Sequence, residues 1–238
     1  MTMKRELGSI ISAGVCVIAW ALAGCSSAPL STGQENTGSS TPSGSSTGSA
    51  TGAPAITSDW VDYPPGPYGT HVGAVIQNFD FLGWKQPDIA AYDVSKVEKI
   101  RLSDFYNPDG RTDVKLLAVN ASAVWCSVCR AEYQDMNDNQ TYAAFRAKGV
   151  EILGTLFQDE SSFPAQPSDL ALWGKVSTHQ VKFPLVLDPS FKLGAFFASD
   201  ATPLNMVIDV RTMKIVSVTM GYATDYWTST VQGLLNKQ

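Results

Sequence analysis

Two apolar runs of strand length lie in the middle of the chain, with a helix-prone stretch between them. Residues 114–122 (VKLLAVNAS) and 150–157 (VEILGTLF) show no clear alternation of polar and apolar side chains, which is typical of strands buried on both faces of a sheet. Residues 130–136 and 140–148 favour helix, with a kink expected at 137–139 and an end at Gly149,. The strand at 114–122 should therefore lie near the centre of a sheet.

The C-terminal part predicts two more strands and a last helix. Residues 206–210 and 214–220 are close enough in sequence to pair as a hairpin,. Weaker patterns predict short strands at 75–82 and 100–105 and a helix at 169–179,. Apolar residues then recur at the i, i+4, i+7 and i+8 spacing of an amphipathic helix: Trp227, Val231, Leu234 and Leu235,. The elements together predict an α/β domain, a mixed sheet covered by helices, with a weakly specified N-terminal extension.

The N-terminal residues have a different composition. Lys4 and Arg5 precede an uncharged apolar stretch, residues 7–24, that ends in small residues before Cys25, an order typical of a secretion signal. An uncleaved membrane anchor is the alternative, because the stretch has about the minimum length that spans a bilayer. Residues 26–57 contain nine Ser, six Thr, five Gly and three Pro. Such a segment cannot bury a core, so it predicts a flexible linker.

The tetrad Leu22-Ala23-Gly24-Cys25 resembles the lipobox of bacterial lipoproteins. The resemblance implies that residues 1–24 are a lipoprotein signal peptide and that Cys25 is the lipid-attached first residue of a linker, 25–57. Ser26 stands where an inner-membrane retention signal carries Asp. We therefore expect a lipid-anchored protein of the cell envelope, on the periplasmic face of the outer membrane if the source has two membranes.

The remainder, residues 58–238, has a length that suits one domain,. Charged residues make up 16% of the chain and hydrophobic residues 44%, which excludes disorder for most of it. The one long apolar run excludes a multispan membrane protein. The net charge of -5 argues against a nucleic-acid partner and against a polybasic membrane-binding surface.

Candidate chemistry centres on Cys126 and Cys129, at the start of the predicted helix. If Cys16 leaves with the signal and Cys25 carries lipid, these are the only thiols of the exported domain. In a Cys-x-x-Cys pair at a helix start, we expect the first sulfur to be exposed, and backbone N–H groups and the helix dipole favour its thiolate. Cys126 would then attack a disulfide, and the more buried Cys129 would resolve the mixed disulfide.

Two structural roles are alternatives for this pair. Half of a zinc site would need two more ligands, and the only histidines are His71 and His179, in no paired ligand spacing,. An inert disulfide would close so short a loop that it would stabilise the fold little. Both alternatives explain the pair less well than redox chemistry does.

The motif and its flanks resemble the thioredoxin-like superfamily, specifically exported, membrane-tethered thiol–disulfide oxidoreductases of the TlpA type that border on the AhpC/TSA peroxiredoxins. The resemblance covers about residues 75–238. It is carried by Trp125-Cys126-Ser127-Val128-Cys129-Arg130-Ala131-Glu132, by Phe183-Pro184-Leu185-Val186-Leu187-Asp188, and by Thr202-Pro203 followed by Ile208-Asp209. It implies a thioredoxin-like fold without a cofactor. It also implies electron exchange with cysteine pairs of exported proteins and with a membrane or periplasmic thiol donor or acceptor.

The resemblance also implies substrate contacts beside the pair. Pro203 should follow a cis peptide bond next to the cysteines and present the backbone of Thr202 to a bound substrate strand. An ordinary proline at a strand start is the alternative. Trp125 would shield the disulfide and contact substrate, or serve in packing.

Glu132 is the candidate proton carrier. It lies three residues after Cys129, hence on the same helical face, and in similar proteins a glutamate there serves the thiols as acid or base. A solvated residue near a helix N-terminus is the alternative. Asn120 stands where the best-known thioredoxins carry a buried aspartate, and this departure favours Glu132.

Three other functions remain open. Peroxiredoxins carry a Pro-x-x-x-Thr-x-x-Cys pattern, and Val119 and Ala123 stand at its first two positions here, which argues against a peroxidase. A copper chaperone could hold Cu(I) with Cys126, Cys129 and His179, although related copper proteins space their cysteines by three residues. A tethered binding domain with incidental thiols is the third. The sequence does not determine whether the pair reduces or oxidises its partners.

Overall fold

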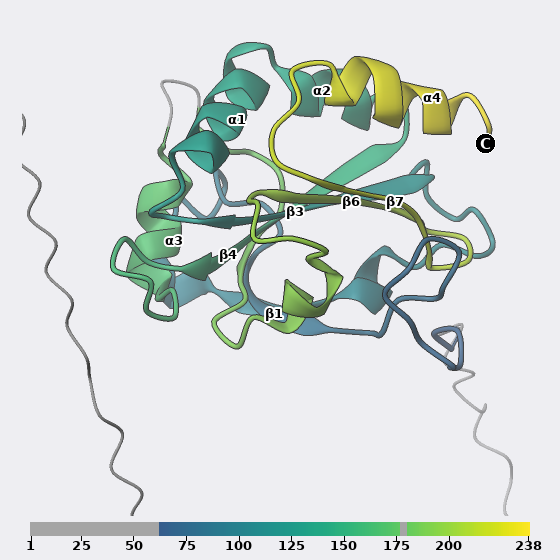
Figure 1. Cartoon of the computed structure of the whole chain (residues 1–238), viewed down its shortest axis with the longest axis horizontal. Helices are drawn as coiled ribbons and strands as arrows, with labels where there is room; N and C mark the ends of the chain where they lie inside the picture. Colours follow the sequence, from purple (N-terminus) through teal and green to yellow (C-terminus); the bar gives the residue numbers. More distant parts are fainter. Residues whose placement is uncertain (1–61, 177–179) are drawn as a thin grey trace, which may run out of the picture. The chain divides into compact units, whose positions relative to one another are not determined.

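A seven-stranded mixed sheet forms the centre of the fold, with strand order β2-β1-β5-β4-β3-β6-β7 (Figure 1). The computed structural model describes residues 62–176 and 180–238. β4 runs parallel to both β3 and β5, and the other neighbouring pairs are antiparallel. The strands are β1 (Asp80–Trp84), β2 (Glu98–Arg101), β3 (Leu116–Ala123), β4 (Val150–Gln158), β5 (Leu185–Leu187), β6 (Leu204–Asp209) and β7 (Lys214–Met220). The predicted mixed α/β sheet is confirmed.

Helical segments connect and cover these strands. They are η1 (Val94–Lys96), η2 (Leu102–Phe105), α1 (Ser127–Asp138), α2 (Thr141–Arg146), α3 (Pro167–Trp173), η3 (Lys192–Phe196), the π-helical η4 (Tyr226–Val231) and α4 (Gln232–Leu235). Figure 1 shows α1, α2 and α4 together on one side of β3, β6 and β7. None of the helices within residues 62–176 and 180–238 is both long and apolar enough to cross a bilayer.

The two apolar runs form central strands, as predicted. Every residue of β3 is buried, and in β4 only the side chains of Glu151 and Gln158 are partly accessible. β3 pairs with β4 along one edge and with β6 along the other, and the burial of all its side chains shows that both of its faces are covered. Gly154 in β4 lets Tyr133 of α1 pack onto this sheet, because a Cβ atom at Gly154 would collide with the Tyr133 hydroxyl. The region that holds α1 is therefore tightly packed.

The weaker N-terminal predictions were wrong in their bounds. The strand predicted at 75–82 begins only at Asp80, because Val75 forms isolated bridges to Tyr68 and Lys214 instead. The strand predicted at 100–105 ends at Arg101. There the Asp104 carboxylate accepts a hydrogen bond from the Arg101 N–H, which turns the chain into the 3-10 helix η2.

Three helix bounds also differ from prediction. α1 begins at Ser127 rather than at residue 130. It ends at Asp138, within the kink predicted at 137–139, and Gln140 beyond it adopts φ 51°. Pro167 begins α3 earlier than predicted and the helix ends at Trp173, while residues 177–179 lie outside the described part. The terminal helix starts with the π-helical turns of η4. β5 was not predicted from the apolar pattern, because a strand of only three residues is too short to show a periodicity.

Candidate active site

The cysteine pair lies at the junction of β3 and α1, as predicted. Cys126 is the N-cap residue of α1, and its Sγ accepts a hydrogen bond from the Cys129 N–H at 3.0 Å. Cys126 and Cys129 form a disulfide with their Cα atoms 5.3 Å apart. The N-cap position exposes the first sulfur to the unpaired N–H groups and the positive end of the helix dipole. This geometry favours negative charge on Cys126 once the disulfide is reduced.

The expected exposure of Cys126 was wrong in degree. Cys129 has no exposed surface, and Cys126 is only 4% exposed. One cause of this low exposure is the segment before β6, where the Thr202 hydroxyl donates a hydrogen bond to Cys126 Sγ at 3.2 Å. Two neighbours in sequence are accessible instead, since Trp125 is 40% and Val128 47% exposed. A partner must therefore approach Cys126 past these side chains and Thr202.

The cis peptide bond expected between Thr202 and Pro203 is present. Pro203 is buried and β6 begins at the next residue. The bond to the Cys126 sulfur brings this segment to the cysteine pair, 76 residues away in sequence. That the Thr202 backbone pairs with a substrate strand stays a prediction.

Trp125 is held by a polar contact rather than by the core. Its Nε1 donates a hydrogen bond to Gln158 Oε1, at the end of β4, at 2.9 Å. On the other side of the motif, Arg130 donates to the Val124 carbonyl at 2.9 Å and lies 3.6 Å from the Glu160 carboxylate. The loop after β4 is thereby tied to the start of α1, beside the cysteines.

Glu132 is fully buried, so its interpretation as a solvated helix residue is wrong. Its Oε2 accepts a hydrogen bond from Asn120 Nδ2 at 2.7 Å, and its Oε1 accepts one from Asn205 Nδ2 at 2.9 Å. The sequence drew attention to Asn120 but not to Asn205. An amide in the otherwise largely apolar strand that follows Pro203 was the available signal.

Burial raises the pKa of Glu132 to about 7, since the charged form loses its hydration,. The hydrogen bonds from Asn205 and Asn120 oppose this effect, because they favour the carboxylate, and the nearby Asp135 carboxylate adds to it. Glu132 therefore changes protonation near neutral pH, the range in which a general acid or base is most effective.

Two of the predictions involve residues that lie outside the described part of the chain. Within the described residues, no three His, Cys, Asp or Glu side chains are grouped so as to hold a metal ion. His179 lies outside those residues, so the copper alternative stays a prediction. The signal peptide, Cys25 and the linker also lie outside them.

The sheet, the cysteine pair at the start of α1 and the cis-proline segment beside it define a thioredoxin-like protein. Residues 82–217, which are 136 of the 238 residues, match the model of the AhpC/TSA family. The chain belongs to this family.

The chain is similar to several known proteins. Thiol-disulfide oxidoreductase ResA of Bacillus cereus is 25% identical over 143 residues, which cover 60% of this chain and 72% of that protein. A protein from Chlorobium tepidum assigned as the thiol:disulfide interchange protein DsbE is 18% identical, with TM-score 0.52, over 71% of this chain and 98% of its own. Reduced 2-Cys peroxiredoxin of Plasmodium vivax is 15% identical, with TM-score 0.52, over 71% of this chain and 83% of its own.

The two solved structures show the fold alone. The relationship to ResA, combined with the disulfide-bonded Cys126–Cys129 pair, supports an oxidoreductase of the thiol–disulfide class. The predicted enzyme class is therefore confirmed.

The hydrogen bond from Thr202 leads to a first testable prediction. In Thr202→Val the hydroxyl that donates to Cys126 Sγ is lost. We expect Cys126 of the reduced protein to react about tenfold more slowly with iodoacetamide at neutral pH, because a hydrogen bond to a charged group contributes about 1.5 kcal/mol or more. Mass spectrometry of the alkylated protein measures the rate. Thr202→Ser, which keeps the hydroxyl, serves as the control, and equal rates for Thr202→Val and the unmodified chain would contradict the prediction.

Proposed function

We propose that the chain exchanges disulfides with cysteine pairs of exported proteins while it is attached to the cell envelope through a lipid on Cys25. The observation that supports the proposed exchange reaction most directly is the position of the Cys126 sulfur. It caps α1, it accepts hydrogen bonds from the Cys129 N–H and the Thr202 hydroxyl, and it is bonded to the buried sulfur one turn along the helix.

The reaction proceeds in two thiol–disulfide exchange steps. The Cys126 thiolate attacks one sulfur of a substrate disulfide, whose S–S bond breaks as the Cys126–substrate bond forms, and the departing substrate thiolate takes up a proton. Cys129 then loses its proton and attacks Cys126 Sγ, which releases the second substrate thiol. The substrate gains two electrons and two protons, and the protein is left with its Cys126–Cys129 disulfide. The reverse sequence oxidises a dithiol.

Glu132 serves as the acid and base of these steps. It lies one helical turn after Cys129, and its pKa of about 7 makes both protonation states available at neutral pH,. As the carboxylate it accepts the Cys129 proton, and as the acid it returns a proton when the reaction runs in reverse. The Asn120 side chain has no ionisable group, so Glu132 takes the role in this chain.

Substrates are bound by the accessible surface around Cys126. Trp125 supplies an exposed aromatic ring, and the Thr202 backbone before Pro203 offers groups for an extended strand,. A membrane or periplasmic thiol donor or acceptor uses the same surface to reset the cysteine pair between turnovers.

The reduction potential of the cysteine pair tests the proposal and its direction. We expect the pair to equilibrate with glutathione as a two-electron couple and to catalyse exchange with insulin disulfides or a dithiol peptide. A potential near about −270 mV indicates a reductase, and one near about −120 mV indicates a disulfide donor. A pair that does not equilibrate with glutathione, in a protein without exchange activity, would overturn the proposal.

The proposed anchor is tested separately, by fractionation of cells that produce the full chain. Cys25→Ser is expected to move the protein from the membrane fraction to the soluble fraction or to leave it as unprocessed precursor, since the lipid cannot be attached. Ser26→Ala, which keeps the cysteine, should leave the protein with the membrane. An unchanged distribution of Cys25→Ser, with the signal removed, would contradict lipid attachment at this residue.

A further inference from the structure

Asn120 and Asn205 form a polar pair within a largely apolar sheet. Asn120 of β3 and Asn205 of β6 are directly opposite in the antiparallel register, so their side chains leave the sheet on the same face. Both are only 3% exposed. Two buried amides cost free energy unless their polar atoms are paired. Their presence here therefore calls for an explanation.

The two amides hold the two oxygens of one carboxylate. Asn120 Nδ2 donates to Glu132 Oε2 at 2.7 Å, and Asn205 Nδ2 donates to Glu132 Oε1 at 2.9 Å. Asn120 Nδ2 also donates to Asn205 Oδ1 at 3.0 Å. Ser122 lies two residues along β3, hence on the same face, and its hydroxyl donates to Asn120 Oδ1. That last bond directs the NH₂ group of Asn120 toward Glu132.

We propose that Asn120 and Asn205 are positioning residues, an amide clamp that fixes both oxygens of Glu132 and keeps its carboxylate form accessible at neutral pH. The inference rests on the proposed role of Glu132 in thiol–disulfide exchange. Burial favours the protonated acid, whereas the two N–H donors favour the carboxylate. Without the clamp, a smaller fraction of Glu132 is ionised at neutral pH and able to accept the proton of Cys129.

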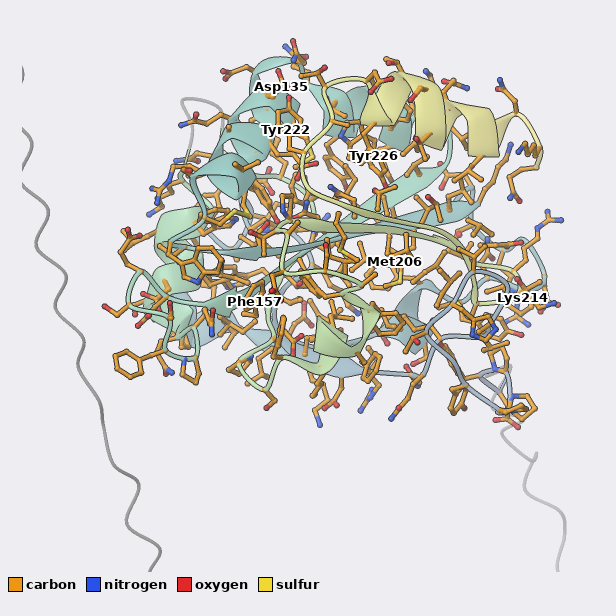
Figure 2. All side chains as sticks on the ribbon, viewed as in Figure 1. Asp135, Phe157, Met206, Lys214, Tyr222 and Tyr226 are labelled. Carbon is orange, nitrogen blue, oxygen red and sulfur yellow. A yellow bond between two sulfur atoms is a disulfide. The ribbon has the colours of Figure 1, made fainter. Side chains whose placement is uncertain are left out.

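One nearby ionisable group, the Asp135 carboxylate, acts in the opposite sense. Asp135, one turn further along α1, carries a negative charge that opposes ionisation of Glu132. Its Oδ2 accepts a hydrogen bond from the Tyr222 hydroxyl, in the segment after β7, at 2.6 Å. Figure 2 shows Asp135, Tyr222 and Tyr226 on the same side of the sheet.

The neighbouring tyrosines stay neutral. Burial raises the pKa values of Tyr222, Tyr226 and Tyr133, and the negative charge of Glu132 raises each of them further. In the reduced protein, Cys129 on the preceding turn of α1 is the thiol whose proton Glu132 is proposed to accept. Asn205 and Asn120 are thus the neighbours that favour the Glu132 carboxylate, and removing either one should shift the balance toward the acid.

The protonation of Glu132 can be measured directly in the oxidised protein. Infrared difference spectra against Glu132→Gln identify the carbonyl band of the protonated acid, and its loss with rising pH gives the midpoint. We expect Asn205→Leu and Asn120→Leu each to raise this midpoint by about one pH unit, because each removes a hydrogen bond to the charged form. The exchange rate should shift along the pH axis in the same direction.

Asn107→Leu is the matched control. Asn107 is also a buried asparagine, but it donates to the backbone carbonyls of Thr112 and Val114. Its replacement should lower stability without moving the Glu132 midpoint. An unchanged midpoint in folded Asn205→Leu and Asn120→Leu would overturn the clamp.

A smaller change covers the case in which the leucine variants do not fold. Ser122→Ala removes the bond that orients the Asn120 amide and adds no bulk, so we expect a smaller upward shift of the midpoint, and no shift would count against the clamp. The infrared measurement does not require turnover. Absence of exchange in the unmodified protein would therefore contradict the proposed function, whereas an unmoved midpoint would contradict only the clamp.

Discussion

Cys129→Ser is expected to turn the protein into a covalent trap for its substrates, while Cys126→Ser abolishes exchange. In Cys129→Ser, Cys126 still attacks a disulfide, but the resolving sulfur is missing, so the mixed disulfide persists. In Cys126→Ser no nucleophilic sulfur is left at the N-cap, and we expect turnover to fall by about three orders of magnitude or more. Serine is itself a favoured N-cap residue, so α1 should be preserved.

The two variants are distinguished by their products as well as by their rates. Non-reducing electrophoresis and mass spectrometry should detect mixed disulfides on Cys126 in Cys129→Ser and none in Cys126→Ser. Ser127→Ala, at the accessible position between them, is the control and should retain most of the turnover. Full turnover by Cys126→Ser would assign the thiols an incidental role, as in a tethered binding domain.

Glu132→Gln is expected to remove a pH dependence of stability that lies between about pH 4.5 and about pH 7. The pKa of Glu132 is about 7 in the folded protein, against 4.5 for the ordinary side chain. Between these values the folded state binds more protons than the unfolded state, so the free energy of unfolding falls as the pH rises. The contribution is fully present below about pH 4.5. It decreases by about 3 kcal/mol by the time the pH passes about 7.

Urea denaturation of the oxidised protein at a series of pH values measures this effect. The difference in unfolding free energy between the unmodified chain and Glu132→Gln should change across the window and be constant on either side. Taking the difference removes the contributions of other buried carboxyls, including Glu151 and Asp188, whose pKa values burial also raises. Glu160→Gln, at an exposed glutamate, should show no such change. A pH-independent difference for Glu132→Gln would show that its carboxyl does not titrate in this range.

Local sequence patterns were sufficient for the centre of the fold. The apolar runs at 114–122 and 150–157 predict strands because a strand buried on both faces needs apolar side chains at successive positions. The Cys-x-x-Cys pair and the stretch after it predict a helix start, and the structure differs there by only three residues. Where the pattern was short or mixed, as at 75–82 and 100–105, a backbone bridge or a single side-chain cap decided the bounds.

By itself, the sequence determined that two thiols one helical turn apart follow a buried strand, which was enough to predict thiol–disulfide chemistry. Only the tertiary structure decided what surrounds them. The pairing of Asn120 with Asn205 depends on the register of strands 85 residues apart, and the covering of Cys126 depends on Thr202, 76 residues away. Periodicity reports which face of an element is apolar, but it carries no information about which distant residue meets that face. The burial of Glu132 raises its pKa, and the hydrogen bond from Asn205, 73 residues away, opposes this effect; neither can be read from a local pattern.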